Sequence, residues 1–134
     1  MQLLVNIDVD DLERAIHFYT SAFDLVCQRR LFAGSVAELV GAGCSLHLLA
    51  KPAGTAGAHG ITQVRQYNRH WTPVHLDFTV PDIAAAVQRA VAAGAVLETQ
   101  IQSCDWGRHA QLSDPFGHGF CLVEFSPQGY AAAP

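Results

Sequence analysis

Hydrophobic and polar residues alternate in two short segments of the chain, and a helical pattern follows each of them. Residues 3–9 read LLVNIDV and residues 74–80 read VHLDFTV, with an apolar side chain at every second position. A period of two is typical of a strand with one buried face. The following segments, 10–16 and 81–87, space their apolar residues as a helix does. The pattern indicates an internal repeat of a strand and a helix.

The first copy, residues 1–50, predicts a strand, a helix and three further strands. Asp10 and Glu13 form a D-x-x-E pattern, which is a helix-start signal. The runs expected to form the later strands are separated by turns that contain glycine, and they cover residues 25–32, 35–40 and 44–49. This order predicts a βαβββ unit.

The second copy, residues 73–126, repeats this order. Its helix is expected over 82–93, with Gly94 as the stop signal, and Asp114 to Gly117 read as a D-P-F-G turn. The expected strands after the helix cover residues 96–102, 108–113 and 120–125.

The remaining segments lack such patterns. Residues 51–72 are rich in glycine and predict a connector, and residues 127–134 predict a tail. We therefore expect residues 1–134 to form a single α+β domain, in which tandem βαβββ units form a curved mixed sheet around a cavity.

Composition narrows the partners and the location. Half of the 134 residues are hydrophobic, which is enough for an ordinary core, and the net charge is -4. Basic residues cluster only at Arg29 and Arg30, so no nucleic-acid partner is expected. No stretch approaches the roughly 20 apolar residues of a membrane span, and the start of the sequence does not resemble a leader. We expect a cytoplasmic protein without membrane contact.

The four cysteines form no C-x-x-C pair and are expected to be reduced thiols in strands. Cys27 and Cys104 are 77 positions apart, as are Cys44 and Cys121. This spacing predicts an offset of 77 between the later strands of the two copies, compared with 71 for the first strands.

The tandem units, together with VDDLERAIHFY at residues 9–19 and DPFGH at residues 114–118, resemble the vicinal oxygen chelate superfamily. That group includes glyoxalase I, bleomycin resistance proteins, fosfomycin resistance enzymes and extradiol dioxygenases. The resemblance covers essentially the whole chain. It implies a ligand cavity that is often completed by a second subunit, and in the enzymes of the group a divalent metal in this cavity.

The resemblance also implies metal ligands on the first and last strands of each unit. The first such position falls on Leu4, the repeat counterpart of His75, and leucine has no lone pair to donate. The other positions fall on His75, on His47 or Ser45, and on Cys121 or Glu124. Counting from the D-P-F-G turn selects Cys121, whereas the offset of 77 pairs His47 with Glu124. These two candidates lie on opposite faces of a regular strand.

Polar side chains share one face of the strand that contains His75, Asp77 and Thr79, and Asn6 and Asp8 show the same alternation in the first strand. We expect the strand with His75 to be central, where a polar face usually lines a cavity. His75 then either contacts a ligand or is a structural histidine bonded to Asp77 or to the backbone.

Five aromatic residues lie outside the core pattern: Phe32, Tyr67, Trp71, Trp106 and Phe116. Phe32, Trp71 and Trp106 are the candidates for the ligand site. Their rings can supply stacking surface for a planar or cationic ligand. The alternative is that Trp71 packs in the connector and Trp106 packs at the end of a sheet.

The leading interpretation is a homodimer that binds a small organic ligand without a metal, similar in role to bleomycin resistance proteins. No catalytic residue is assigned. The expected ligand-binding residues are Asn6, Phe32, His47, Trp71, His75, Asp77, Trp106 and Cys121.

Two alternatives remain open. One is a glyoxalase- or dioxygenase-like enzyme, in which His47, His75 and Glu124 bind a divalent Fe, Zn, Ni or Mn ion that polarises vicinal oxygens of the substrate. The other is a subunit that mainly mediates assembly and retains a vestigial cavity.

Overall fold

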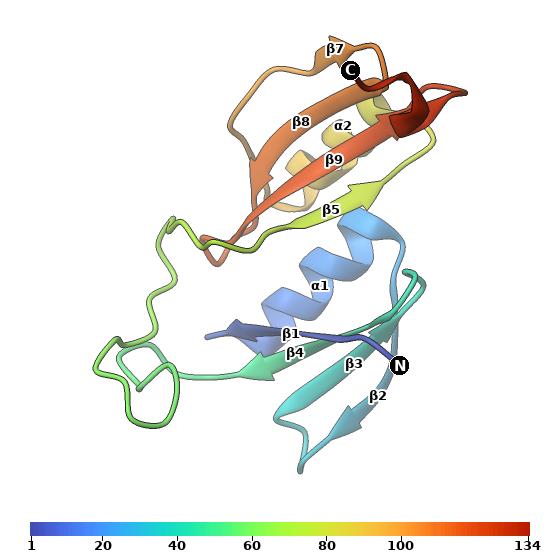
Figure 1. Cartoon of the computed structure of the whole chain (residues 1–134). Helices are drawn as coiled ribbons and strands as arrows, with labels where there is room; N and C mark the ends of the chain where they lie inside the picture. Colours follow the sequence, from blue (N-terminus) through green and yellow to red (C-terminus); the bar gives the residue numbers. More distant parts are fainter. The chain divides into compact units, whose positions relative to one another are not determined.

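The computed structural model describes residues 1–134 and shows an α+β protein with two open, mixed sheets (Figure 1). The chain divides into two compact units, Met1–Asn68 (unit 1) and Arg69–Pro134 (unit 2). Each unit has one α-helix that packs on its own sheet, and each follows the predicted βαβββ order, with one strand of unit 2 interrupted.

Unit 1 contains a four-stranded sheet. Its elements are β1 (Leu4–Val9), α1 (Leu12–Phe23), β2 (Val26–Leu31), β3 (Val36–Val40) and β4 (Ser45–Ala50). The strand order is β1-β4-β3-β2, and β1 runs parallel to β4 while the other pairs are antiparallel. The parallel pair requires a long connection, which α1 and the β2–β3 hairpin supply.

One face of this sheet packs against α1. The helix buries Phe18 and Tyr19, and β4 buries Leu46 and Leu48, whose side chains alternate with that of His47. The predicted start of α1 is shifted by one residue. Asp11, rather than Asp10, is the N-cap, and its carboxylate accepts a hydrogen bond from the Arg14 N–H at 3.0 Å.

Unit 2 contains a five-stranded sheet. Its elements are β5 (Leu76–Thr79), α2 (Ile83–Ala93), β6 (Val96–Leu97), β7 (Gln102–Cys104), β8 (Gly107–Ser113), β9 (Gly119–Phe125) and the 3₁₀ helix η1 (Gly129–Ala132). The order is β5-β9-β8-β6, and β7 also pairs with β8. The predicted single strand over 96–102 is therefore wrong. The Thr99 hydroxyl replaces a backbone carbonyl as the acceptor for the Gln111 N–H, which interrupts the ladder.

The predicted helix and turn signals of unit 2 are confirmed. Gly94 ends α2 in the left-handed conformation, with φ +117°, and its N–H returns to the carbonyls of the last helical turn. In the D-P-F-G turn, the Gly117 N–H donates to the Asp114 carbonyl at 3.2 Å. The Asp114 carboxylate accepts from the N–H groups of Phe116 and His118 at 2.8 and 2.9 Å.

Strand β5 differs from its prediction in two respects. It begins at Leu76, so His75 lies in the segment that precedes the strand. It also lies at the edge of its sheet and pairs only with β9, so the expected central position is wrong. Asp77 and Thr79 are exposed while Leu76 and Phe78 are half-buried, because a strand with helix on one side alone keeps the predicted alternation.

The predicted connector belongs to both units rather than standing between them. In unit 1, Arg65 Nε lies 2.6 Å from Asp8 Oδ2, and the Tyr67 hydroxyl donates to the Lys51 carbonyl at 2.6 Å. From Arg69 onward the chain is part of unit 2. These contacts fix both ends of a segment that has no periodicity of its own.

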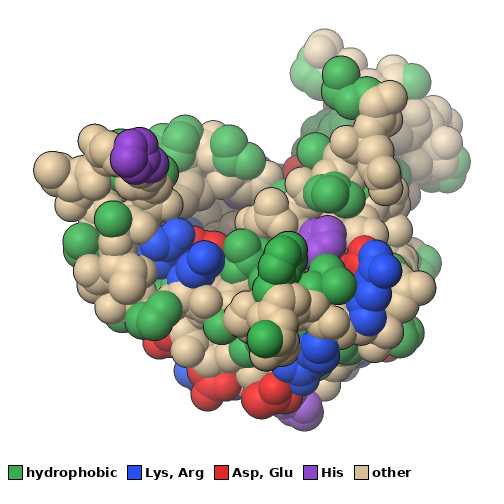
Figure 2. Space-filling view, turned by 90° about the horizontal axis from the view of Figure 1, so that it is seen from below, with side chains coloured by type: hydrophobic (Ala, Val, Ile, Leu, Met, Phe, Trp, Pro, Cys, Tyr) green, Lys and Arg blue, Asp and Glu red, His purple; other side chains and the backbone are tan.

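Neither helix is long and apolar enough to cross a bilayer. On the face drawn in Figure 2, basic and acidic side chains are interspersed with hydrophobic ones and form no continuous basic patch.

Candidate functional site: a pocket in unit 2

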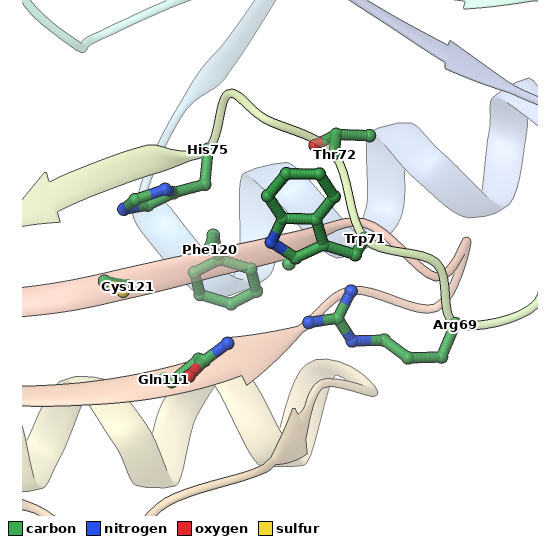
Figure 3. A pocket seen from close by; sticks show the side chains of 8 residues that line it. Arg69, Trp71, Thr72, His75, Gln111, Phe120 and Cys121 are labelled. Atoms are coloured by element: carbon green, nitrogen blue, oxygen red, sulfur yellow. The ribbon is translucent and has the colours of Figure 1, made fainter.

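The segment before β5 and the strands β8 and β9 enclose a pocket within unit 2. Its volume is about 200 Å³. It is lined by Arg69, Trp71, Thr72, His75, Gln111, Gly119, Phe120 and Cys121. Figure 3 shows Trp71 and His75 extending from the segment toward the two strands, whereas the Thr72 side chain points away from them. We call this cavity the unit 2 pocket.

The sheet register brings the floor of the unit 2 pocket together. Asp77 on β5 lies beside Cys121 on β9, and Cys121 lies beside Gln111 on β8. Leu122, the next residue along β9, is buried on the side of the sheet that α2 covers. Successive side chains of a strand point to opposite faces, so this polar row lies on the face away from the helix.

Hydrogen bonds to the β8–β9 turn hold the segment over the sheet. The His70 N–H donates to the Gly117 carbonyl at 3.1 Å. The rings of His70 and His118 meet edge to face, with Nε2 of the first 3.0 Å from Nδ1 of the second. Trp71 and His75 are thereby carried to the rim of the pocket on a tethered segment.

His75 interacts with Asp77 and lines the pocket at the same time. The distance from Nε2 to the Asp77 Oδ1 is 3.1 Å, and 59% of the histidine side chain is exposed. The exposure argues against a buried structural histidine. A single contact with Asp77 orients the ring and leaves its other nitrogen available.

Cys121 is a neutral thiol at neutral pH. Burial raises its pKa to about 11, and the negative charge of Asp77 adds to this shift. A thiolate is the nucleophilic form of cysteine, so this side chain is a poor nucleophile. It contributes a small, weakly polar surface to the pocket.

The three candidate aromatic residues are separated by the structure. Trp71 lines the pocket and is 81% exposed. Trp106 lies elsewhere in unit 2, where it stacks on His109 with ring centres 5.5 Å apart and also contacts Tyr130. Phe32 is an exposed residue of the β2–β3 turn in unit 1. Trp106 therefore packs at the end of a sheet, and neither it nor Phe32 lines the unit 2 pocket.

The candidates in unit 1 form a row across its sheet. Asn6 on β1, His47 on β4, Glu38 on β3 and Arg29 on β2 are register partners. Glu38 is buried and accepts a hydrogen bond from Arg29 Nε, which lowers the pKa of the carboxyl group. His47 Nε2 lies 3.6 Å from the same carboxylate, and its buried Nδ1 has no partner.

The predicted metal set does not fit the structure, because Glu124 is already engaged. Its carboxylate accepts from Arg108 Nη2 at 2.6 Å and from the Ile83 N–H at the start of α2 at 2.7 Å. Both interactions lower the pKa of Glu124, and the hydrogen bond from Arg108 has the larger effect. This geometry suits a charge that stabilises a helix N-terminus.

The register also corrects the offset of 77. His47 lies opposite Asn6, and Cys121 lies opposite Asp77. Asn6 and Asp77 are counterparts in the repeat, so the counterpart of His47 is Cys121 and not Glu124. The cysteine spacing was a coincidence, and Cys121, which the count from the D-P-F-G turn selects, lines the pocket while Glu124 does not.

A different donor set exists inside unit 2. The nitrogen, oxygen and sulfur ligand atoms of His75, Asp77 and Cys121 all lie within 4.8 Å of one another. These donor types suit zinc or another borderline-soft divalent ion.

Five residues line the pocket but were not predicted to bind a ligand: Arg69, Thr72, Gln111, Gly119 and Phe120. Gln111 carried a signal, because it alternates with the apolar residues of β8 as Cys121 does with those of β9. Arg69 and Thr72 lie in a segment without periodicity, and Gly119 and Phe120 are the first two residues of β9. Only the folded chain places these four residues at the pocket.

A tandem βαβββ protein with a pocket on the sheet face away from its helix has the fold of the vicinal oxygen chelate superfamily. The sequence matches the family described as "Glyoxalase-like domain" over residues 4–123. The chain belongs to this glyoxalase-like family.

Curated relatives support the assignment at the level of the family. An uncharacterised protein of Mycobacterium bovis is 35% identical over 120 residues, which are 85% of this chain and 76% of the relative. The anthracycline biosynthesis protein DnrV of Streptomyces peucetius is 42% identical over 78 residues, which are 58% of this chain and 27% of that protein.

Solved structures share the fold at low identity. The fosfomycin resistance protein FosX of Listeria monocytogenes has a TM-score of 0.71 and 17% identity, covering 96% of this chain and 93% of its own. A glyoxalase-related enzyme of Fulvimarina pelagi has a TM-score of 0.69 and 18% identity, covering 92% of this chain and 87% of its own.

Proposed function

We propose that this protein binds a small, planar organic molecule in the unit 2 pocket without a metal ion, as a drug-sequestering protein does. The observation that carries the proposal is an exposed indole beside convergent polar groups. Trp71 offers a ring face, while His75 and Gln111 offer hydrogen-bonding atoms around the same cavity. Small-molecule sites typically combine aromatic lining with a few such groups.

The size of the pocket limits what it encloses. At about 200 Å³ it is smaller than most drug sites, which start near 300 Å³. We expect it to hold one end of a fused-ring molecule whose remainder lies against the exposed Trp71.

The anthracycline biosynthesis relatives are consistent with this ligand class. Anthracyclines are planar, polycyclic aromatic quinones, and the match to DnrV covers 58% of this chain. A flat quinone is the kind of surface on which an indole stacks.

Two features support binding without a metal. Leu4 stands where the family resemblance places a metal ligand, and Glu124 is held by Arg108 and the start of α2. Binding by enclosure needs none of these groups as a metal ligand.

The proposed assembly is a homodimer. Strands β1 and β5 are the edges of their sheets, and unpaired sheet edges favour association. Sedimentation at micromolar concentration tests this part, and a monomer at that concentration would refute it.

The binding proposal is tested by calorimetric titration with 1,4-dihydroxyanthraquinone in a buffer that contains a chelator. Trp71→Leu is expected to weaken binding about tenfold or more, equal to about 1.4 kcal/mol. Trp106→Leu is the matched control, because it removes the same side chain outside the pocket. Absence of binding by the unmodified protein, or equal losses in the two variants, would contradict the proposal.

A second candidate function is a metal-dependent lyase or dioxygenase. The cluster of His75, Asp77 and Cys121 favours it, since a bound divalent ion would polarise vicinal oxygens of a substrate. Zinc at 100 times its dissociation constant would then stabilise the protein by about 2.7 kcal/mol. A thermal shift of that size that disappears in His75→Ala would put this function first.

A further inference from the structure

Arg69 is held in one orientation at the rim of the unit 2 pocket. Its Nε and Nη2 donate to the two carboxylate oxygens of Glu98, the second at 3.1 Å. Its Nη1 donates to the carbonyls of His70 and Gly117, the latter at 3.4 Å. A guanidinium has five N–H groups, so these four bonds leave a single N–H, on Nη2, without a partner in the protein.

Gly119 provides the place where this guanidinium lies. A Cβ at position 119 would be 2.7 Å from Arg69 Nη2 and 3.2 Å from its Cζ. The backbone at Gly119 is outside the left-handed region, so space and not conformation requires glycine here. Figure 3 shows the guanidinium directed between Trp71 and Gln111.

The charges around the pocket do not favour an anion. Arg69 is the only lysine or arginine that lines it. Glu98 neutralises this guanidinium, and the negative charge of Asp114 also acts on it. Asp77, a predicted ligand-binding residue, does not line the pocket, but it is the register partner of Cys121, which does, and its side chain is 42% exposed. The pocket region therefore carries more negative than positive charge.

The geometry of Arg69 also opposes a carboxylate. A carboxylate binds arginine best through two parallel N–H groups, and Glu98 already occupies that fork. A carbonyl oxygen needs only one donor, and one remains.

Resting on the proposed binding function, we propose that the unit 2 pocket selects uncharged planar ligands that carry a carbonyl oxygen, such as quinones and aryl ketones, and rejects carboxylates. Arg69 is the residue that determines this specificity. It donates its remaining N–H to the ligand carbonyl, Glu98 cancels its charge, and Gly119 leaves room for it.

The experiment compares two probes of the same ring system by calorimetry, 9,10-anthraquinone and anthraquinone-2-carboxylate. The unmodified protein should bind the uncharged quinone at least about tenfold more tightly than the carboxylate. In Glu98→Gln, which frees the fork and removes one negative charge, this preference should fall about tenfold or reverse. Glu13→Gln is the control, because it breaks an exposed arginine–glutamate pair in unit 1.

Gly119→Ala provides a second test, because it displaces the guanidinium while every charge remains. Quinone affinity should fall about tenfold, with an unchanged circular dichroism spectrum. If Gly119→Ala does not fold, the Glu98→Gln comparison decides.

Equal affinity for the two probes, or a preference that Glu98→Gln leaves unchanged, would overturn the assignment of specificity while binding itself stands. If neither probe binds the unmodified protein, the proposed function fails, and the specificity assignment fails with it.

Discussion

The two units bury one face of their own sheets in the same way, but they differ in the polar residues on the opposite face. In both, apolar residues of the last strand pack under the helix, with Leu48 in unit 1 and Leu122 in unit 2 fully buried. On the opposite face, unit 1 carries the row Asn6, His47, Glu38 and Arg29, and unit 2 carries Asp77, Cys121 and Gln111.

The difference lies in how the polar groups are satisfied. In unit 1, the Glu38 carboxylate forms an ion pair with Arg29 and lies 3.6 Å from His47 Nε2. The charged groups of this row therefore interact with one another. In unit 2 the corresponding positions hold a neutral thiol and an exposed amide, and a pocket lies above them. A duplicated fold can thus close one polar face on itself and keep the other available for a ligand.

The largest expected effect on stability concerns the buried sheet face that both units have in common. Leu48→Ala and Leu122→Ala should each lower the free energy of unfolding by about 3 kcal/mol, because each leaves a cavity in a fully buried core. Urea denaturation measures this loss. A much smaller loss at one position would show that the two cores are not equivalent.

Giving unit 2 the residue types that unit 1 has at the corresponding positions should weaken ligand binding to its sheet face. In the double variant Gln111→Glu and Cys121→His, a charged, bulkier pair replaces the neutral floor of the pocket. Affinity for 1,4-dihydroxyanthraquinone should fall about tenfold or more. Calorimetry provides the measurement, and the matched control is the double variant Gln111→Asn and Cys121→Ser, which keeps both side chains small and uncharged and retains the amide. Equal binding by the two double variants would refute the argument that the neutral side chains of Cys121 and Gln111 keep the pocket open.

The pH dependence of stability should report on the Arg29–Glu38 ion pair of the unit 1 row. The hydrogen bond from Arg29 lowers the pKa of Glu38, so this carboxylate stabilises the folded state above its unfolded pKa of about 4.3. That contribution is lost as the pH falls through the lower folded pKa. At pH 7, Glu38→Gln should therefore have a lower melting temperature than the unmodified protein. This difference in melting temperature should become smaller near pH 3. Identical pH profiles would mean that the pair contributes nothing.

The smallest expected effect concerns the Cys121 thiol. In a variant with serine at the other three cysteines, alkylation by iodoacetamide should titrate with a midpoint of about 11. Asp77→Asn removes one negative charge, lowers the pKa and speeds the reaction several-fold at pH 9. The midpoint should stay above the ordinary value of about 8.5, because burial is the larger cause. A midpoint that Asp77→Asn does not move would show that Asp77 leaves the thiol unaffected.

The sequence by itself determined the repeated units and their cores. Alternation in residues 3–9 and 74–80, the stop at Gly94 and the D-P-F-G turn were sufficient, because strands, caps and turns depend on neighbouring residues. Local signals were less exact where a side chain entered the ladder, as Thr99 does between β6 and β7.

Only the tertiary structure decided which residues meet. The sequence left open whether Cys121 or Glu124 faces the cavity. The pairing of β5 with β9 places Cys121 beside Asp77, whereas Glu124 accepts a hydrogen bond from the start of α2. Arg69 gave no signal, since its orientation depends on Glu98 and on the space at Gly119, residues far away along the chain. Periodicity reports which face of a strand is buried, but the partners on that face depend on register and on loops that only the folded chain brings together.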